Sequence, residues 1–345
     1  MSRTLQRLRE RTNGYTVTPA QYLRIAYAAL LALTLIVLTG AAVRLTGSGL
    51  GCPTWPKCYG NLYPPLNSHA IIEFSNRVVS VPVVLFAGAA WVGALRRRPY
   101  RRELVWLAGL LPLGVVAQAV MGGLTVKGAL DYGWVMGHFA LSMLILVAAV
   151  LLVWRARREP DAAAGRQARR AAPVAGADRT LVLWSRALVA LGALTVFAGT
   201  AATAAGPHAG GSPGQKINRL SFDGRGTMDF VIHRHGEIAL AFGLASVWLW
   251  WLARKRKAPQ GMQRPLTVLC VLLALQGAVG LDQYKTHLPT QLVWVHVALA
   301  CCSWIAVLWA ALAISPLALR RAAGAPQRPV EGPLRAATPA KFPGN

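Results

Sequence analysis

Negative charge is scarce in this chain. Its 345 residues include 12 Asp and Glu against 37 Lys and Arg, and only 14% of residues are charged, whereas 54% are hydrophobic. The apolar residues fall in evenly spaced runs separated by short basic clusters, which excludes an ordinary soluble domain. Because an apolar helix of about 20 residues crosses a bilayer, the sequence predicts an all-α polytopic membrane protein.

Eight runs are long enough to span a membrane. We expect them at residues 22–45, 70–95, 104–124, 132–154, 181–204, 228–252, 265–281 and 290–313. They divide the chain into a cytoplasmic N-terminal segment (1–21), a four-helix bundle (22–154), a cytoplasmic linker (155–180), a second four-helix bundle (181–313) and a disordered cytoplasmic tail (314–345). The first run is too long for a cleavable signal peptide and lacks a small-residue cleavage site.

The positive charge, a formal net +25, is concentrated in alternate loops. Basic clusters precede the first run and follow the second, fourth, sixth and eighth runs. This is the positive-inside pattern, which places both termini in the cytoplasm. Such a distribution argues against nucleic acid as a partner and fits contact with anionic lipid headgroups. We expect a multi-pass protein of the plasma membrane of a bacterial cell.

Cysteine is also rare, with five in the chain. Cys270, Cys301 and Cys302 lie in apolar runs, where small hydrophobic filler is the ordinary role. Cys52 and Cys58 lie in the first non-cytoplasmic loop, "GLGCPTWPKCYG", where oxidising conditions allow a disulfide. A structural disulfide, a redox-active dithiol and free thiols all stay open here. Two cysteines alone give too few ligands for a metal site.

The two halves of the chain resemble each other. Gln118 opens "QAVMGGLTV" and precedes His138 by 20 residues, and Gln276 opens "QGAVGLDQY" and precedes His296 by 20 residues. This spacing predicts matching helix–loop–helix units. Two further matches pair Gly40 with Gly199 and the dipeptide Asn76–Arg77 with His233–Arg234. Because an even number of spans separates the halves, we expect two tandem bundles with the same topology in the membrane.

Histidines inside apolar spans are candidates for haem ligation. Two neutral imidazoles on facing helices of a four-helix bundle are a good axial ligand set for haem iron, and His233 with His296 fits that arrangement. His235 is the alternative ligand, but it lies two positions from His233 and so faces well away around the helix. Arg77 and Arg234 are suited to neutralising haem propionates, although either arginine is equally able to snorkel towards an interface.

The stretch "IIEFSNRVVS" carries polar groups into the second span. Glu73, Asn76 and Arg77 follow at i, i+3 and i+4 and therefore share one helix face. One interpretation is a buried ion pair with an amide that packs beside it. The other gives Glu73 acid–base or charge-stabilising work beside a bound substrate, since ionisable residues within spans usually face a functional interior.

Six motifs together resemble the haem A synthase family over residues 22 to 313: "TGAAVRLTGSGLGCPTWPKC", "IIEFSNR", "GHFALSML", "GPHAG", "IHRHG" and "WVHVALACC". The resemblance implies a membrane haem-dependent oxidoreductase that oxidises the C8 methyl of haem O to a formyl group. The product, haem A, serves terminal oxidases, so the activity belongs to cytochrome oxidase assembly. A non-catalytic membrane b-type cytochrome or haem carrier is the alternative function.

The resemblance also implies roles for particular residues. It implies a haem b cofactor with its iron between His233 and His296, and a site for substrate haem O in the first half with His138 as one ligand. Glu73 corresponds to the family's essential glutamate. Cys52 and Cys58 correspond to an outer-loop pair found in many members. The implied partners are haem O synthase, which makes the substrate, and an unidentified electron-transfer partner.

Asn76 departs from the family's pattern, because many members have a histidine before the arginine at this point. We therefore expect Asn76 and Arg77 in the substrate haem pocket, with His138 as the one protein histidine on that iron. An open or water-occupied iron position and an altered activity are both compatible with this change.

Overall fold

The computed structural model describes residues 15–158, 179–212, 214–222 and 226–314. Within these ranges the chain forms eight long helices, α2 (Pro19–Leu45), α3 (Ser68–Arg96), α4 (Arg102–Lys127), α5 (Tyr132–Ala156), α7 (Arg179–Ala205), α8 (Thr227–Lys255), α9 (Gln260–Lys285) and α10 (Thr290–Ala313). All eight are long and apolar enough to cross a membrane. The prediction of an all-α polytopic membrane protein is confirmed. Most of the predicted N-terminal segment, linker and tail lies outside the described residues.

The predicted helix limits agree with the structure to within a few residues, except in α9. The sequence suggested a start at Pro265, but α9 begins at Gln260 with Pro259 as its N-cap. Pro265 lies in the second turn, where its missing N–H costs one intrahelical hydrogen bond without ending the helix. The start of α2 has a capping box, in which Thr18 and Gln21 bond reciprocally and Pro19 follows the cap.

The internal repeat is visible in helix lengths. α2 and α7 have 27 residues each, α3 and α8 have 29 each, α4 and α9 have 26 each, and α5 and α10 have 25 and 24. The limits of α3 and α8 are 159 positions apart at both ends. This register pairs Asn76 with His235, which corrects the pairing of Asn76 with His233 that the sequence match suggested.

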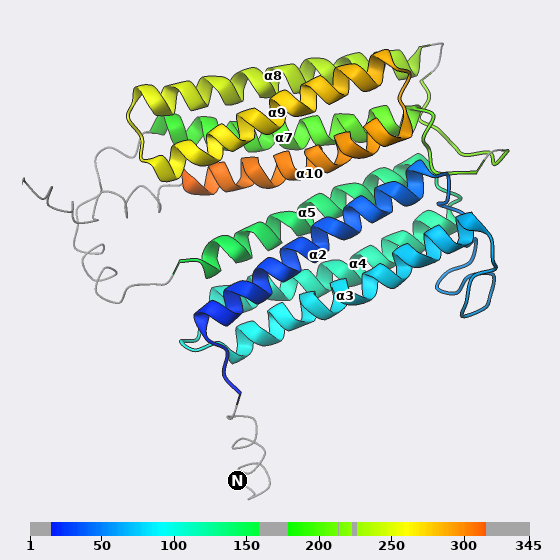
Figure 1. Cartoon of the computed structure of the whole chain (residues 1–345), viewed down its shortest axis with the longest axis horizontal. Helices are drawn as coiled ribbons and strands as arrows, with labels where there is room; N and C mark the ends of the chain where they lie inside the picture. The colour runs from blue at the N-terminus through cyan, green and yellow to red at the C-terminus, as the bar shows by residue number, and fades with distance from the viewer. Residues whose placement is uncertain (1–14, 159–178, 213, 223–225, 315–345) are drawn as a thin grey trace, which may run out of the picture.

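The helices form two groups that lie side by side, α2–α5 and α7–α10 (Figure 1). α10 joins them, since it packs against α2 and α5 of the first half. Trp304 of α10 donates its indole N–H to the carbonyl of Met143 at 3.1 Å, and Trp294 donates to the carbonyl of Leu38 at 3.1 Å. The α2–α3 and α7–α8 loops are also joined, because the N–H of Gly49 donates to the carbonyl of Gly210 at 2.8 Å.

Candidate functional site

The loop between α2 and α3 folds back onto α3. Cys52 and Cys58 form a disulfide, and both are fully buried. The disulfide packs on Ala70 in the first turn of α3. Of the alternatives that the sequence left open, the structure therefore contains the disulfide.

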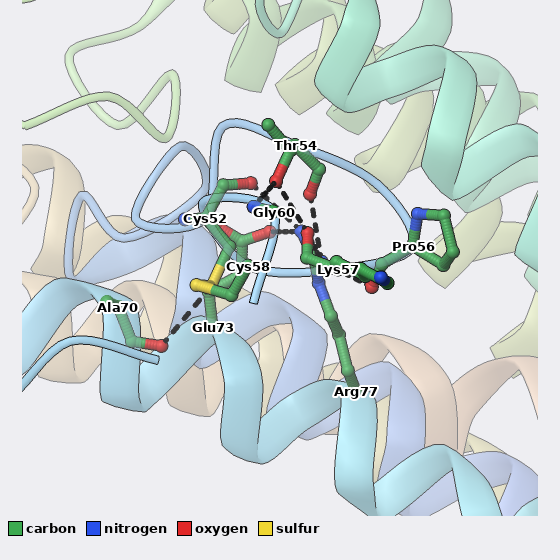
Figure 2. A network of polar contacts seen from close by, with 9 residues as sticks. All are labelled: Cys52, Thr54, Pro56, Lys57, Cys58, Gly60, Ala70, Glu73 and Arg77. Carbon is green, nitrogen blue, oxygen red and sulfur yellow. Dashed lines mark hydrogen bonds and ion pairs between the residues drawn. A yellow bond between two sulfur atoms is a disulfide. The ribbon is translucent and has the colours of Figure 1, made fainter. Parts of the chain in front are cut away.

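Glu73 lies beneath this loop with both carboxylate oxygens occupied (Figure 2). Its Oε2 accepts the backbone N–H of Cys52 at 2.7 Å, and its Oε1 lies 2.5 Å from a guanidinium nitrogen of Arg77. Only 6% of Glu73 is exposed. The ion pair that the i, i+4 spacing suggested is present, and the carboxylate also anchors the cysteine loop.

Arg77 binds the loop through its other donors. Its Nη1 donates to the carbonyl oxygens of Thr54, Pro56 and Lys57 at 3.1, 3.1 and 3.2 Å, and its Nη2 donates to that of Cys52 at 3.0 Å. Figure 2 shows the side chain rising from α3 into the ring of loop carbonyls. A planar guanidinium with several fixed donors suits such a ring. Arg77 was expected in the haem pocket, but its guanidinium is turned towards the loop.

The same loop reaches across to α4. A Cβ placed on Gly123 would lie 3.0 Å from the indole ring of Trp55, so this loop residue rests directly on the α4 backbone. The neighbouring Gly122 faces His138, whose Cε1 would lie 3.5 Å from a Cβ at that glycine. The loop thus covers the end of the first bundle where His138 lies. Sequence reasoning missed Trp55, and its position between two prolines in the cysteine loop was the available signal.

His138 and His296 have equivalent surroundings in the two halves. The side-chain amide of Gln118 donates to the carbonyl of His138 at 3.1 Å, and that of Gln276 donates to the carbonyl of His296 at 3.1 Å. In both histidines Nδ1 is buried and has no hydrogen-bond partner among the described residues. The predicted equivalence of the two Gln–His units is therefore reproduced in atomic contacts.

His235, and not His233, faces His296. The ring centroids of His235 and His296 are 6.2 Å apart, and Nδ1 of His235 is buried without a partner in the described part of the chain. His233 is exposed, donates its Nδ1–H to the carbonyl of Asp229 at 2.7 Å and lies beside Tyr284. The two residues lie about 200° apart around the helix. The expectation that His233 opposes His296 is thus corrected.

Arg234, which was expected near the haem b propionates, is also turned outward. It pairs with Glu237 of the same helix at 2.8 Å, and both side chains are 56% exposed. Its guanidinium lies over the ring of Phe230. These contacts are those of an exposed helix face.

Asn76 occupies in the first half the place of His235 in the second. Its side-chain Oδ1 accepts the hydroxyl of Thr39 of α2 at 2.7 Å. The first residues of α2 and α7 are 160 positions apart, and so are their last residues. This offset pairs Thr39 with Gly199, whereas the sequence match paired Gly40 with Gly199. A Cβ on Gly199 would lie 3.1 Å from Cε1 of His235. A glycine–histidine contact in one half thus replaces a threonine–asparagine contact in the other.

The second half has the donor set of a haem site. Two imidazoles that share one iron, each through a metal–nitrogen bond of about 2 Å, have ring centres about 6 Å apart. The separation of 6.2 Å between His235 and His296 fits this requirement.

Comparison with known proteins shows the family to which the chain belongs. The profile of the COX15-CtaA family, described as cytochrome oxidase assembly protein, matches residues 23–308. The chain belongs to the COX15-CtaA family. A heme A synthase of Symbiobacterium thermophilum is 33% identical over 252 residues, which are 71% of this chain and 80% of that protein. A heme A synthase of Shewanella oneidensis is 26% identical over 297 residues, 76% of this chain and 87% of that protein.

Some relatives match over a shorter region. A heme A synthase of Geobacillus kaustophilus is 36% identical over 146 residues, which are 40% of this chain and 45% of the relative. The chain thus matches less than half the length of this and several similar relatives. The family resemblance expected from the six motifs is confirmed, and with it a multi-pass membrane protein.

Proposed function

We propose that this protein is a haem A synthase of a bacterial plasma membrane, which oxidises the C8 methyl of haem O to a formyl group. The observation that carries the proposal is the facing pair His235 and His296, two half-buried imidazoles with ring centroids 6.2 Å apart. Membership of the COX15-CtaA family and relatives called heme A synthase support it. The haem A produced would serve terminal oxidases.

In this proposal the second half, residues 181–313, holds haem b through His235 and His296. A haem bound there supplies one-electron redox chemistry. The protein's own contribution is to hold two imidazoles from α8 and α10 at a fixed separation inside an apolar bundle. An unidentified electron-transfer partner, a redox carrier of the membrane, takes up the electrons.

The first half, residues 22–154, is proposed to receive haem O from haem O synthase. His138 ligates the substrate iron from α5, and Asn76 presents an amide bound to Thr39 where the second half has an imidazole. The reaction adds oxygen and removes electrons: the methyl group and water give the formyl group, protons and electrons. Glu73 and Arg77 keep the cysteine loop closed over this end of the bundle, and the loop excludes bulk water.

The test is expression of the full chain in a host that makes haem O but not haem A, followed by haem extraction and chromatography. We expect haem A with the wild-type protein and with His233→Ala, and loss of haem b with His235→Ala or His296→Ala. Bound haem without any haem A would make the protein a non-catalytic b-type cytochrome instead. Equal loss of haem b in His233→Ala and His235→Ala would overturn the ligand assignment.

The role of Glu73 is tested separately with Glu73→Gln. The amide cannot keep the charge-assisted bonds of the carboxylate, whose loss costs about 1.5–3 kcal/mol each. We expect turnover to fall at least about tenfold, which corresponds to about 1.4 kcal/mol, while haem b stays bound to the second half. Unchanged turnover would show that the reaction does not depend on the carboxylate that Glu73 offers to the loop and to Arg77.

A further inference from the structure

Gln118 and Gln276 make the same unusual contact in the two halves. Each lies on the helix that precedes the histidine helix and donates its side-chain amide to the carbonyl of the histidine itself, at 3.1 Å in both cases. That carbonyl already lies in the hydrogen-bond ladder of its helix, so the glutamine adds a second donor to it. In the first half Ser142 adds to the contact, since Gln118 also bonds its hydroxyl at 2.6 Å.

A glycine follows each glutamine by one helical turn and lies against the imidazole. A Cβ placed on Gly122 would be 3.5 Å from Cε1 of His138. A Cβ on Gly280 would be 3.2 Å from Cε1 and 3.5 Å from Nδ1 of His296. Residues at i and i+4 share one face of a helix. The backbone of the histidine and its ring therefore rest on the same face of α4 or α9.

We propose that the pairs Gln118/Gly122 and Gln276/Gly280, here called the cradles, are positioning residues for the haem-ligating imidazoles. This inference rests on the proposed function. The glutamine fixes the height and rotation of the histidine helix, and the glycine lets the ring lie against the neighbouring backbone. In the second half Cε1 and Nδ1 of His296 face Gly280, which leaves Nε2 as the nitrogen for iron.

A purely structural role would be ordinary helix–helix bonding by a polar residue within the membrane. Two facts favour the cradle. The hydrogen bond goes to the histidine carbonyl in both halves. In both halves the glycine one turn after the glutamine also leaves a volume that the ring of the same histidine faces. Gln263, on the same helix as Gln276, instead donates to Ala258 at 2.6 Å, near the start of α9.

The test uses the purified full-length protein with its haem. Gly280→Ala and Gln276→Leu change the second cradle, and Gly277→Ala and Gln263→Leu are matched controls on α9. A Cβ on Gly277 would have no described atom within 4 Å outside its own helix turn. The readouts are the electron paramagnetic resonance spectrum of the ferric haem and the rate of haem transfer to apomyoglobin. We expect a high-spin fraction and about tenfold faster transfer in both cradle variants, and wild-type behaviour in both controls.

The outcomes separate this inference from the proposed function. A wild-type protein without haem would overturn the proposed function itself. Haem in the wild type with identical spectra and transfer rates in all four variants would overturn the cradle and leave the proposed function standing. Gly280→Ala keeps every hydrogen bond, so it decides alone if Gln276→Leu does not accumulate. Control variants that change as much as the cradle variants would also overturn the inference.

Discussion

At the scale of single residues, the two halves differ at one pair of contacting positions on neighbouring helices. Thr39 and Asn76 bond to each other at 2.7 Å in the first half, and Gly199 makes room for His235 in the second. A side chain at position 39 and an imidazole at position 76 would compete for one volume. Asparagine at position 76 is thus matched by threonine at position 39, where the second half has histidine and glycine.

This exchange predicts a non-additive pair of substitutions. Asn76→His alone should bind substrate haem poorly as a second axial ligand, because the Thr39 side chain occupies the volume its ring needs. Thr39→Gly with Asn76→His should restore a second imidazole and give an additional low-spin haem signal in protein loaded with haem O. The measurement is electron paramagnetic resonance of the two single variants and the double variant.

The reciprocal change provides the control. Gly199→Thr should displace His235, since even a Cβ at this position would lie 3.1 Å from its ring, and should lower the haem b content. Additive effects of Thr39→Gly and Asn76→His in the first half would contradict the coupling.

At the scale of elements, the loop from Thr46 to Asn67 is attached to α3 by more than its disulfide. The guanidinium of Arg77 holds carbonyl oxygens of four loop residues, and Glu73 holds a backbone N–H. Irregular backbone of this kind leaves many carbonyls that need donors. Here a single arginine on a regular helix supplies donors to four of these carbonyls.

Arg77→Lys should loosen this loop. A lysine keeps the positive charge but has a single ammonium group, which cannot reach the whole ring of carbonyls. If the free energy that favours the closed loop falls by about 1.4 kcal/mol, the population of the open loop rises tenfold. We therefore expect at least about tenfold faster trypsin cleavage after Lys57, measured by mass spectrometry of the purified protein, with the disulfide intact.

Arg234→Lys is the matched control, because this arginine makes an exposed ion pair in the other half. Cleavage after Lys57 at the same rate in Arg77→Lys, Arg234→Lys and the wild type would show that the loop is held without the arginine.

Sequence periodicity predicted the helices well, because eight long apolar runs have few alternative arrangements. It singled out Glu73, Asn76, His138 and His296 as candidates, since polar groups inside such runs are conspicuous. It chose His233 over His235 because short motifs do not fix a register to within two residues, whereas the contacts of His235 with His296 and Gly199 do. It also could not show that Arg77 serves the loop, because the path of irregular backbone is not periodic.

At the scale of the whole molecule, the positive-inside pattern predicts which loops face the cytoplasm. The short connection between α3 and α4 carries Arg97, Arg98 and Arg101, and the cysteine loop lies at the other end of α3. We propose that both chain termini lie on the same side as this basic connection.

Thiol labelling in intact cells tests this orientation. Leu66 in the cysteine loop is 98% exposed, and Tyr100 in the basic connection is 54% exposed. A membrane-impermeant maleimide should label Leu66→Cys in intact cells, and Tyr100→Cys only after the membrane is permeabilised. The wild-type chain reports the background from its own cysteines. Labelling of Tyr100→Cys alone in intact cells would require the opposite orientation.

The two halves should unfold together, because α10 is bonded to both. Trp304 is 6% exposed and gives its indole N–H to the carbonyl of Met143 in α5. Its neighbour Trp309 packs edge-on against Trp154, with ring centroids 5.0 Å apart. Hydrogen bonds between membrane helices contribute about 0.6 kcal/mol on average. A hydrogen bond between the two halves stabilises their association, whereas a hydrogen bond within one half stabilises only the fold of that half.

Trp304→Phe should therefore broaden or split the thermal unfolding transition of the purified protein. Trp250→Phe removes an equivalent bond inside the second half, from Trp250 to the hydroxyl of Thr267 at 2.9 Å, and should shift the transition by about 2 °C without broadening it. The measurement is differential scanning calorimetry in detergent, with haem absorbance as a second probe of the second half. Coincident, equally sharp transitions in both variants would show that the Trp304 bond does not couple the halves, which are also joined by the bond from Trp294 to Leu38 and the bond from Gly49 to Gly210.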